Sequence, residues 1–196
     1  MSTSTIAHSA CKATLFIMIG LAPSYAFADW SGAYAGLSFG ALTKGEGTST
    51  FEEVEETAKI AGDIIFGGFA GYQTQNETVV YGGELEIGRA NDFTITSGDD
   101  VINRDFTLID LKARLGQDVG AALIYGVGGL SQVQAFGDFD GEDTARGFNI
   151  GVGLDYKIND QFTFGAEYLA RQVVLEDETE FDIDFQTLAL RATMQF

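Results

Sequence analysis

The carboxyl-terminal segment 185–196 (FQTLALRATMQF) alternates between apolar and polar side chains up to its last residue. From Leu188 on, the even positions are apolar and end on the aromatic Phe196, whereas Arg191 lies on the polar face. A period of two is the pattern of a β-strand with one apolar and one polar face. Two architectures use such strands: a soluble barrel with its apolar face inside, and a membrane barrel with its apolar face in lipid.

The first 28 residues have the features of a secretory signal peptide. Lys12 precedes a short apolar run at 13–22, and residues 26–28 (AFA) form a small-x-small cleavage site. The run is too short to be a membrane-spanning helix. We therefore predict that residues 1–28 are removed and that residues 29–196 form one domain.

The predicted leader holds the only cysteine, histidine and proline of the chain, Cys11, His8 and Pro23. Without a histidine, residues 29–196 lack the base of a Ser-His or Asp-His mechanism, so we predict no enzymatic activity and no cofactor. The formal charge of −18 argues against nucleic-acid partners, which bind basic surfaces. No run approaches the roughly 20 apolar residues of a transmembrane helix, so any membrane crossing must use strands.

Eight segments of alternating polarity follow one another after the leader. We expect strands at 30–42, 62–75, 79–90, 105–117, 121–135, 146–158, 162–174 and 185–196. Short connections alternate with longer, acidic ones at 43–61, 91–104, 136–145 and 175–184. Short turns on one side and long loops on the other are typical of outer-membrane barrels, and an even strand number lets the last strand pair with the first. The prediction is an all-β, eight-stranded antiparallel up-and-down transmembrane barrel.

The polar strand faces carry equal numbers of acids and bases. The acids are Glu84, Glu86, Asp110, Asp155 and Glu167, and the bases are Lys112, Arg114, Lys157, Arg171 and Arg191. A closed interior needs this balance because unpaired buried charge is costly, whereas a surface in water does not. The balance favours a membrane barrel with charges in its lumen over a soluble barrel of lipocalin type.

The same reasoning places the apolar faces toward lipid and glycines toward the lumen. Within 121–135 the apolar positions oppose Gln132 and Gln134, and they are therefore expected to face lipid: Leu123, Tyr125, Val127 and Val133. The glycines expected to make room inside are Gly116, Gly128, Gly151, Gly153 and Gly165. Arg89 falls on the lipid side near a long connection, within reach of a lipid phosphate.

Several short motifs recur in order along the chain. They are DWSG (29–32) with Tyr34 and Gly36, GGFAGY (67–72), VYGGELEIG (80–88), KARLG (112–116), IYGVGG (124–129), GVGLDYKIND (151–160), GAEYLA (165–170) and the terminal Phe196. Together they resemble small eight-stranded outer-membrane barrels of the opacity-protein and OmpA-transmembrane-domain type. The resemblance covers nearly all of residues 29–196. It implies a location in the outer membrane of a Gram-negative bacterium and contact with lipopolysaccharide.

In barrels of this type a cluster of acids and bases fills the lumen. The candidate members here are Glu84, Glu86, Asp110, Lys112, Arg114, Asp155, Glu167, Arg171 and Arg191. Where the OmpA branch places an arginine on its seventh strand, this chain has Gly165, so the cluster has to close through Lys112, Arg171 or Arg191. The resemblance also implies that Phe196 is read by the outer-membrane assembly machinery.

We expect a monomer with a structural or surface-interaction role, in which acidic loops contact the environment or a host. A narrow channel and an adhesin-like binding protein remain alternatives. Residues 138–143 (DFDGED) only partly match a calcium loop, because the third spaced ligand before the glycine and the distant Glu of the full motif are missing, and we interpret them as a hydrated turn. We therefore expect no specific metal site and no peptidoglycan-binding domain after Phe196.

Overall fold

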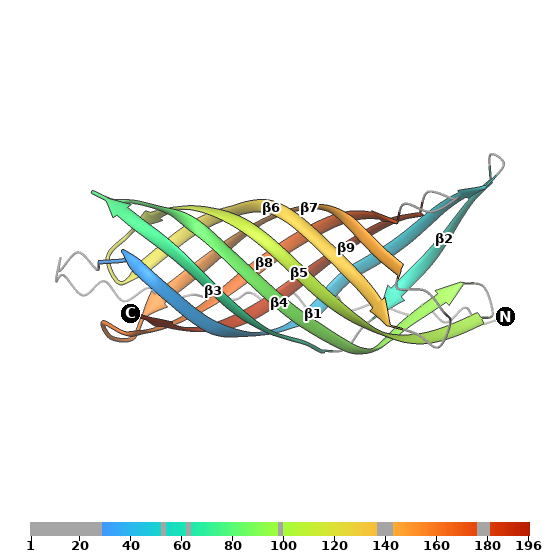
Figure 1. The fold of residues 1–196 in the computed structure, drawn as a ribbon, viewed down its shortest axis with the longest axis horizontal. Coiled ribbons are helices and arrows are strands. Elements are labelled where there is room, and N and C mark those ends of the chain that lie inside the picture. The colour runs from blue at the N-terminus through green and yellow to red at the C-terminus, as the bar shows by residue number, and fades with distance from the viewer. Residues whose placement is uncertain (1–28, 52–53, 62–63, 98–99, 137–142, 176–180) are drawn as a thin grey trace, which may run out of the picture.

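A computed structural model describes residues 29–51, 54–61, 64–97, 100–136, 143–175 and 181–196, so the predicted leader lies outside the described residues. The described residues form one nine-stranded antiparallel sheet (Figure 1). Its strands are β1 (Gly32–Phe51), β2 (Val54–Ala61), β3 (Ile64–Asn76), β4 (Val79–Ser97), β5 (Asp100–Asp118), β6 (Ala122–Phe136), β7 (Asp143–Lys157), β8 (Phe162–Leu175) and β9 (Phe181–Gln195). In this part of the chain no helix has the length and apolarity needed to span a membrane.

Eight of these strands close a barrel, in the order β1-β3-β4-β5-β6-β7-β8-β9. Strand β9 pairs back with β1 along a register that runs from Tyr34↔Gln195 to Ser49↔Phe181, so no edge is left open along this seam. The short strand β2 pairs with the far ends of β1 and β4, the two neighbours of β3, so it continues the position of β3 in the ring toward the loop end. The predicted eight-stranded antiparallel up-and-down barrel is confirmed, and β2 extends its wall above β3.

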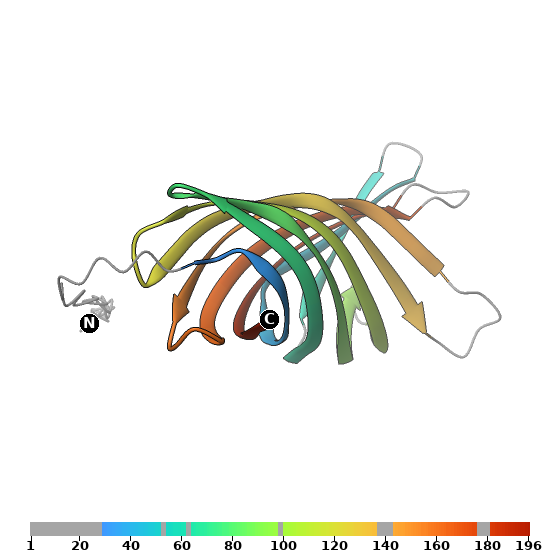
Figure 2. The ribbon, with the colours of Figure 1, turned by 60° about the vertical axis from the view of Figure 1, so that its left-hand side comes forward.

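The connections separate the two ends of the barrel. The turns β3–β4, β5–β6 and β7–β8 lie at the end that also holds Trp30 and Phe196, which we call the turn end (left in Figure 1). Strands β1, β4, β6 and β8 end at the opposite end, the loop end, and β2, β5, β7 and β9 begin there (Figure 2). Several strands extend further toward the loop end than predicted: β1 reaches Phe51 and β4 reaches Ser97. On β1 this extension lacks apolar alternation, which is why the sequence pattern missed it. On β4 Phe93 and Ile95 do alternate with Thr94 and Thr96, but they fall in the acidic segment interpreted as a connection.

The strands are staggered around the barrel. A walk along paired residues from Leu37 on β1 passes once through all eight barrel strands and returns to β1 at Thr48. The return point lies eleven residues further along β1, and one of these residues is the bulge at Thr43. A stagger of this size tilts the strands against the barrel axis, as Figure 1 shows. It also decides which inward side chains meet.

The outer surface of the barrel is apolar and the lumen is charged. Phe148 and Ile150 on β7 are 71% and 70% exposed, and leucine, isoleucine, valine and aromatic side chains continue this surface around the ring. Charged side chains are instead among the most deeply buried ones, including Glu84, Lys112 and Arg191. This is the reverse of a soluble barrel, and it excludes the lipocalin-type alternative.

Strand β6 faces the opposite way from the expectation. Its lumen side is apolar and buried: Leu123, Tyr125, Val127 and Val133. Ile124 and Leu130 are on the outside, 52% and 54% exposed. Both faces of β6 are apolar, so alternation does not decide its facing. The pairing of Gly129 shows which way the strand faces. Gly129 lies opposite Lys112 and Asn149, whose side chains point inward, so its position also faces inward and that of Gly128 faces outward.

Apolar residues flank the charged part of the lumen on both sides. Toward the loop end a buried cluster is formed by Ala90, Leu108, Val133, Ala145, Val173 and Phe185. Toward the turn end Trp30, Val80 and Leu123 belong to a second cluster that continues up one wall through β6 and β8. The polar core of the barrel is therefore enclosed between two apolar clusters.

Candidate functional site in the barrel lumen

The Lys112 ammonium on β5 is surrounded by three carboxylates. Its Nζ lies 2.7 Å from Glu84 Oε1, 2.6 Å from Glu86 Oε2 and 2.7 Å from Glu167 Oε1. The Lys112 and Glu84 side chains have no exposed surface. The ammonium donates hydrogen bonds to Glu86 and Glu167 and contacts Glu84 as an ion pair.

Two arginines complete this cluster. The Arg191 guanidinium on β9 lies 2.6 Å from Glu84, 3.2 Å from Glu167 and 3.5 Å from Glu86. Arg114 on β5 lies 3.0 Å from Glu84 and 2.7 Å from Asp155 on β7. We call these residues the central network: Glu84, Glu86, Lys112, Arg114, Asp155, Glu167 and Arg191. They come from β4, β5, β7, β8 and β9, so the network spans the lumen.

Aromatic rings hold the buried guanidiniums from another side. The Arg114 guanidinium lies 3.9 Å from the centroid of the Tyr125 ring, and that of Arg191 lies 3.8 Å from the centroid of Phe69. Cations are attracted to the faces of aromatic rings, more strongly where water is absent. The Tyr34 and Tyr125 hydroxyls also donate hydrogen bonds to Glu84 and Glu167, at 3.0 and 3.1 Å.

A second polar group lies nearer the loop end. Arg171 on β8 binds Asp110 on β5 through both Nε and an Nη, with a shortest distance of 2.6 Å. The Asp110 carboxylate also accepts hydrogen bonds from Ser131 and Asn149, while Arg171 donates to Thr187. We call Asp110 and Arg171 the loop-side pair.

Lys157 lies apart from both groups, although its parity had placed it with the interior charges. It stands at the turn end of β7, where its ammonium donates to the backbone carbonyl of Asp29 and lies 4.8 Å from the Trp30 ring. The central network therefore has four carboxylates and three cations. Hydroxyl donors compensate for the difference, since Tyr34, Tyr125 and Ser38 all donate to its carboxylates.

Gly165 on β8 explains how the network closes without an arginine at this position. A Cβ at Gly165 would clash with the Asp155 carboxylate, to whose residue Gly165 is paired. The space that a side chain would take is thus filled by Asp155. The network closes through Lys112 and Arg191, two of the three bases that the sequence left open, whereas Arg171 binds Asp110 instead.

The carboxylates of Glu84, Glu86 and Glu167 lie close enough together to hold a cation. The Lys112 ammonium occupies that position, at 2.6–2.7 Å from one oxygen of each. The arrangement therefore supports ion pairing that braces the barrel. The partial calcium motif at 138–143 falls almost entirely outside the described residues.

All nine lumen residues singled out from the sequence lie in the central network or the loop-side pair. Sequence reasoning missed the neutral partners, above all Tyr125 and Phe69. The inward parity of Tyr34 on β1 was available as a signal. For Tyr125 the pattern was misleading, because an apolar position on a strand was assigned to lipid.

Comparisons with known proteins agree with this architecture. A family described as "Outer membrane protein beta-barrel domain" matches residues 13–196. The 25 kDa outer-membrane immunogenic protein of Brucella canis is 30% identical over 153 residues, covering 76% of this chain and 67% of that protein. The 31 kDa outer-membrane immunogenic protein of Brucella melitensis is 28% identical, covering 97% and 95%. The crystal structure of Neisserial surface protein A has the same fold, with a TM-score of 0.53, 14% identity and coverage of 85% and 98%.

Proposed function

Since this chain belongs to the family of outer membrane protein beta-barrel domains, we propose that it braces the outer membrane and presents its loops to the surroundings. Its location in the outer membrane of a Gram-negative bacterium follows from the family and from the named relatives. The observation that carries the proposal is the filled lumen. Its charged side chains bind one another, and none of the ion pairs of the central network has a widely exposed partner.

A filled lumen argues against the channel alternative. A diffusion pore requires a polar path with free space, whereas eight-stranded barrels are just wide enough for side chains to fill. Here the central network spans the lumen, and apolar clusters flank it at both ends. An ion crossing the barrel would have to break several buried ion pairs.

Surface contact is supported by the distribution of charge along the sequence. The loop-end connections are rich in Asp and Glu, as in the segment 176–180 (EDETE). The Brucella relatives are named as immunogenic outer-membrane proteins, which fits loops that are accessible from outside. We infer that the loops contact cationic groups, either on other surface molecules or on a host.

Arg89 supports contact with lipopolysaccharide. Its side chain is 63% exposed on the outer face of β4, paired in register with Phe66 and Thr107, and it forms a 3.5 Å ion pair with Asp105. This position lies toward the loop end of the apolar surface, where lipid phosphates would face the barrel. We infer that Arg89 binds such a phosphate.

Planar-bilayer recordings of the purified barrel test the proposal. We expect no steady single-channel openings. Regular openings would contradict the proposed structural role and show that the barrel conducts ions. A strain that lacks the protein then separates the two roles. The full chain and a chain without residues 176–180 should restore detergent resistance equally, whereas only the full chain should restore binding to cationic surfaces.

A further inference from the structure

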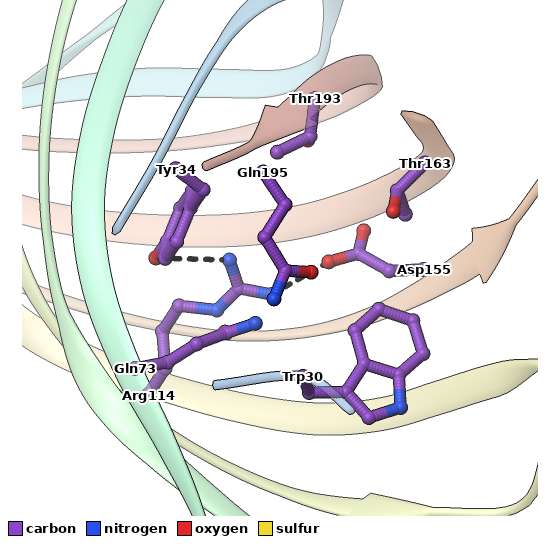
Figure 3. A pocket seen from close by; sticks show the side chains of 8 residues that line it. All are labelled: Trp30, Tyr34, Gln73, Arg114, Asp155, Thr163, Thr193 and Gln195. Carbon is purple, nitrogen blue, oxygen red and sulfur yellow. Dashed lines mark hydrogen bonds and ion pairs between the residues drawn. The ribbon is translucent and has the colours of Figure 1, made fainter. Parts of the chain in front are cut away.

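A small cavity lies in the lumen on the turn side of the central network. It offers about 10 Å³ of space to the centre of a water molecule, which is enough for one. Figure 3 shows its lining, in which Trp30 lies opposite Tyr34 and the Arg114–Asp155 ion pair lies between them. Gln73, Thr163 and Gln195 also line it.

Four lining residues each have a buried polar atom without a hydrogen-bond partner among the described residues. Two are donors, the Nε1–H of Trp30 and the Nε–H of Arg114, and two are acceptors, Oε1 of Gln73 and Oδ1 of Asp155. All four residues are at least nine-tenths buried. Figure 3 shows the Trp30 nitrogen on the ring edge turned away from the Arg114–Asp155 pair. Buried polar groups are normally paired, so the three remaining atoms, on Gln73, Arg114 and Asp155, indicate a ligand in this cavity.

The mixture of donors and acceptors identifies the ligand as water. A metal ion or ammonium would face the N–H donor of Arg114, and an anion would face the Asp155 carboxylate. Water accepts from donors and donates to acceptors, and buried waters typically make two to four such bonds.

The chain segment Asp29–Ser31, which we call the strap, lies next to this cavity at the turn end of the barrel. It precedes β1 and has no strand partner of its own. Gln75 on β3 accepts a hydrogen bond from the Trp30 backbone N–H at 2.9 Å. Gln195 on β9 donates to the carbonyls of Ser31 and Asp29 at 2.6 and 3.2 Å.

The strap is therefore anchored by side chains from β3 and β9, the two strands that flank β1, and by Lys157 on β7, which donates to the Asp29 carbonyl. It carries the Trp30 indole into the lumen, where only 2% of the residue remains exposed. The indole packs among Val80 and Leu123 at the turn end. The strap is held only by a few side-chain hydrogen bonds and one buried ring, whereas each barrel strand is held by a continuous series of backbone hydrogen bonds. The strap is therefore easier to open than the barrel wall.

We propose that the strap is a latch that closes the turn end over a water molecule bound to the Arg114–Asp155 pair. Opening of the latch admits solvent to the central network from the turn side. The loop side stays closed, because the apolar cluster around Phe185 is built from barrel strands.

Trp30 is the only tryptophan of the chain, so its indole N–H gives a single NMR signal. In nanodiscs, the native barrel should show a nuclear Overhauser effect between the Nε–H of Arg114 and a long-lived water. The indole N–H of Trp30 should exchange slowly with deuterium. The absence of a water signal would overturn the bound water, and exchange as fast as in a free indole would overturn the closed latch.

The variant Gln195→Ala removes two strap hydrogen bonds. Each such bond is worth a factor of a few in an equilibrium, so indole exchange should become about tenfold faster or more. Gln161→Ala is the matched control, since Gln161 is an exposed glutamine at the same end and its rate should not change. Gln75→Ala tests the same point should Gln195→Ala fail to fold. Native exchange rates in a folded anchor variant would contradict the latch.

Discussion

Lys112 and Glu167 are joined by a 2.7 Å ion pair across the lumen, between strands β5 and β8, which share no backbone hydrogen bonds. Other ion pairs also join strands that are not neighbours: Arg191 on β9 binds Glu84 on β4, and Arg114 on β5 binds Asp155 on β7. Backbone ladders hold neighbouring strands together, whereas the central network holds opposite walls together. The lumen charges thus act as cross-braces within the ring.

Lys112 is the first cross-brace to test. Lys112→Met leaves Glu84, Glu86 and Glu167 facing one another with only the arginines nearby. Removing one partner of a buried ion pair typically costs about 3–5 kcal/mol, because the remaining charge stays buried. We expect the free energy of unfolding to fall by this amount in urea titrations of the barrel in detergent, followed by gel mobility without heating.

The matched control is Arg89→Met, which removes an exposed cation from its ion pair with Asp105. Pairs of this kind contribute about 0–1 kcal/mol, so the urea midpoint should hardly move. Equal, small effects of the two substitutions would show that the central network does not brace the barrel.

The loop-side pair allows a double-mutant cycle. Asp110 and Arg171 bind each other directly, so Arg171→Met and Asp110→Leu should each destabilise the barrel by about 3 kcal/mol or more by leaving a lone charge. The double variant should lose less than the sum of the two, since neither charge remains. The coupling measured by urea unfolding should be about 1–3 kcal/mol. Additive losses would mean that the two residues act independently.

Parity along each strand predicted much of this site from the sequence. On β5 Leu111 alternates with Lys112, and Ala113 with Arg114. Because charged side chains are costly in lipid, this alternation predicts that Lys112 and Arg114 face the lumen. On β9 the same rule placed Arg191 inside. Strands with one charged and one apolar face were therefore interpreted correctly.

Two features of the site could not be predicted from the alternation of apolar and polar residues. On β6 both faces are apolar, so the inward position of Tyr125 depends on its register with β5 and β7, which is a tertiary property. The choice of partners depends on the stagger of the whole ring, which sets Arg191 beside Glu84 although they are 107 residues apart. Lys157 shows the limit of parity, because its position at a strand end let it reach Asp29 instead.

The apolar outer surface predicts a depth-dependent penalty for charge. Ile150 is 70% exposed near the middle of β7, and Ile150→Lys should cost about 2–4 kcal/mol in lipid vesicles. Gln172→Lys is the control, because Gln172 is an exposed residue near the loop end of β8 and should cost about 0–1 kcal/mol. Urea unfolding in vesicles measures both. Equal penalties would mean that this surface does not face the hydrocarbon core.

Variants of Phe196 allow assembly in the cell to be tested separately from the stability of the fold. Its backbone N–H donates to the Ala33 carbonyl at 2.9 Å, but its side chain is 73% exposed and contributes little to the packing of the barrel. Phe196→Ser keeps the backbone bond, so the purified variant should refold in detergent with an unfolding free energy within about 1 kcal/mol of the native value. In cells, both Phe196→Ser and deletion of Phe196 should strongly lower the amount of folded barrel in the outer-membrane fraction, measured as the band whose gel mobility changes on heating. We expect this loss because the assembly machinery should recognise the aromatic ring.

Deletion of Glu178 in a loop-end connection is the control and should leave that amount unchanged. Normal assembly of both Phe196 variants would contradict the assigned role, and a matching loss of refolding in detergent would assign the ring to the fold instead.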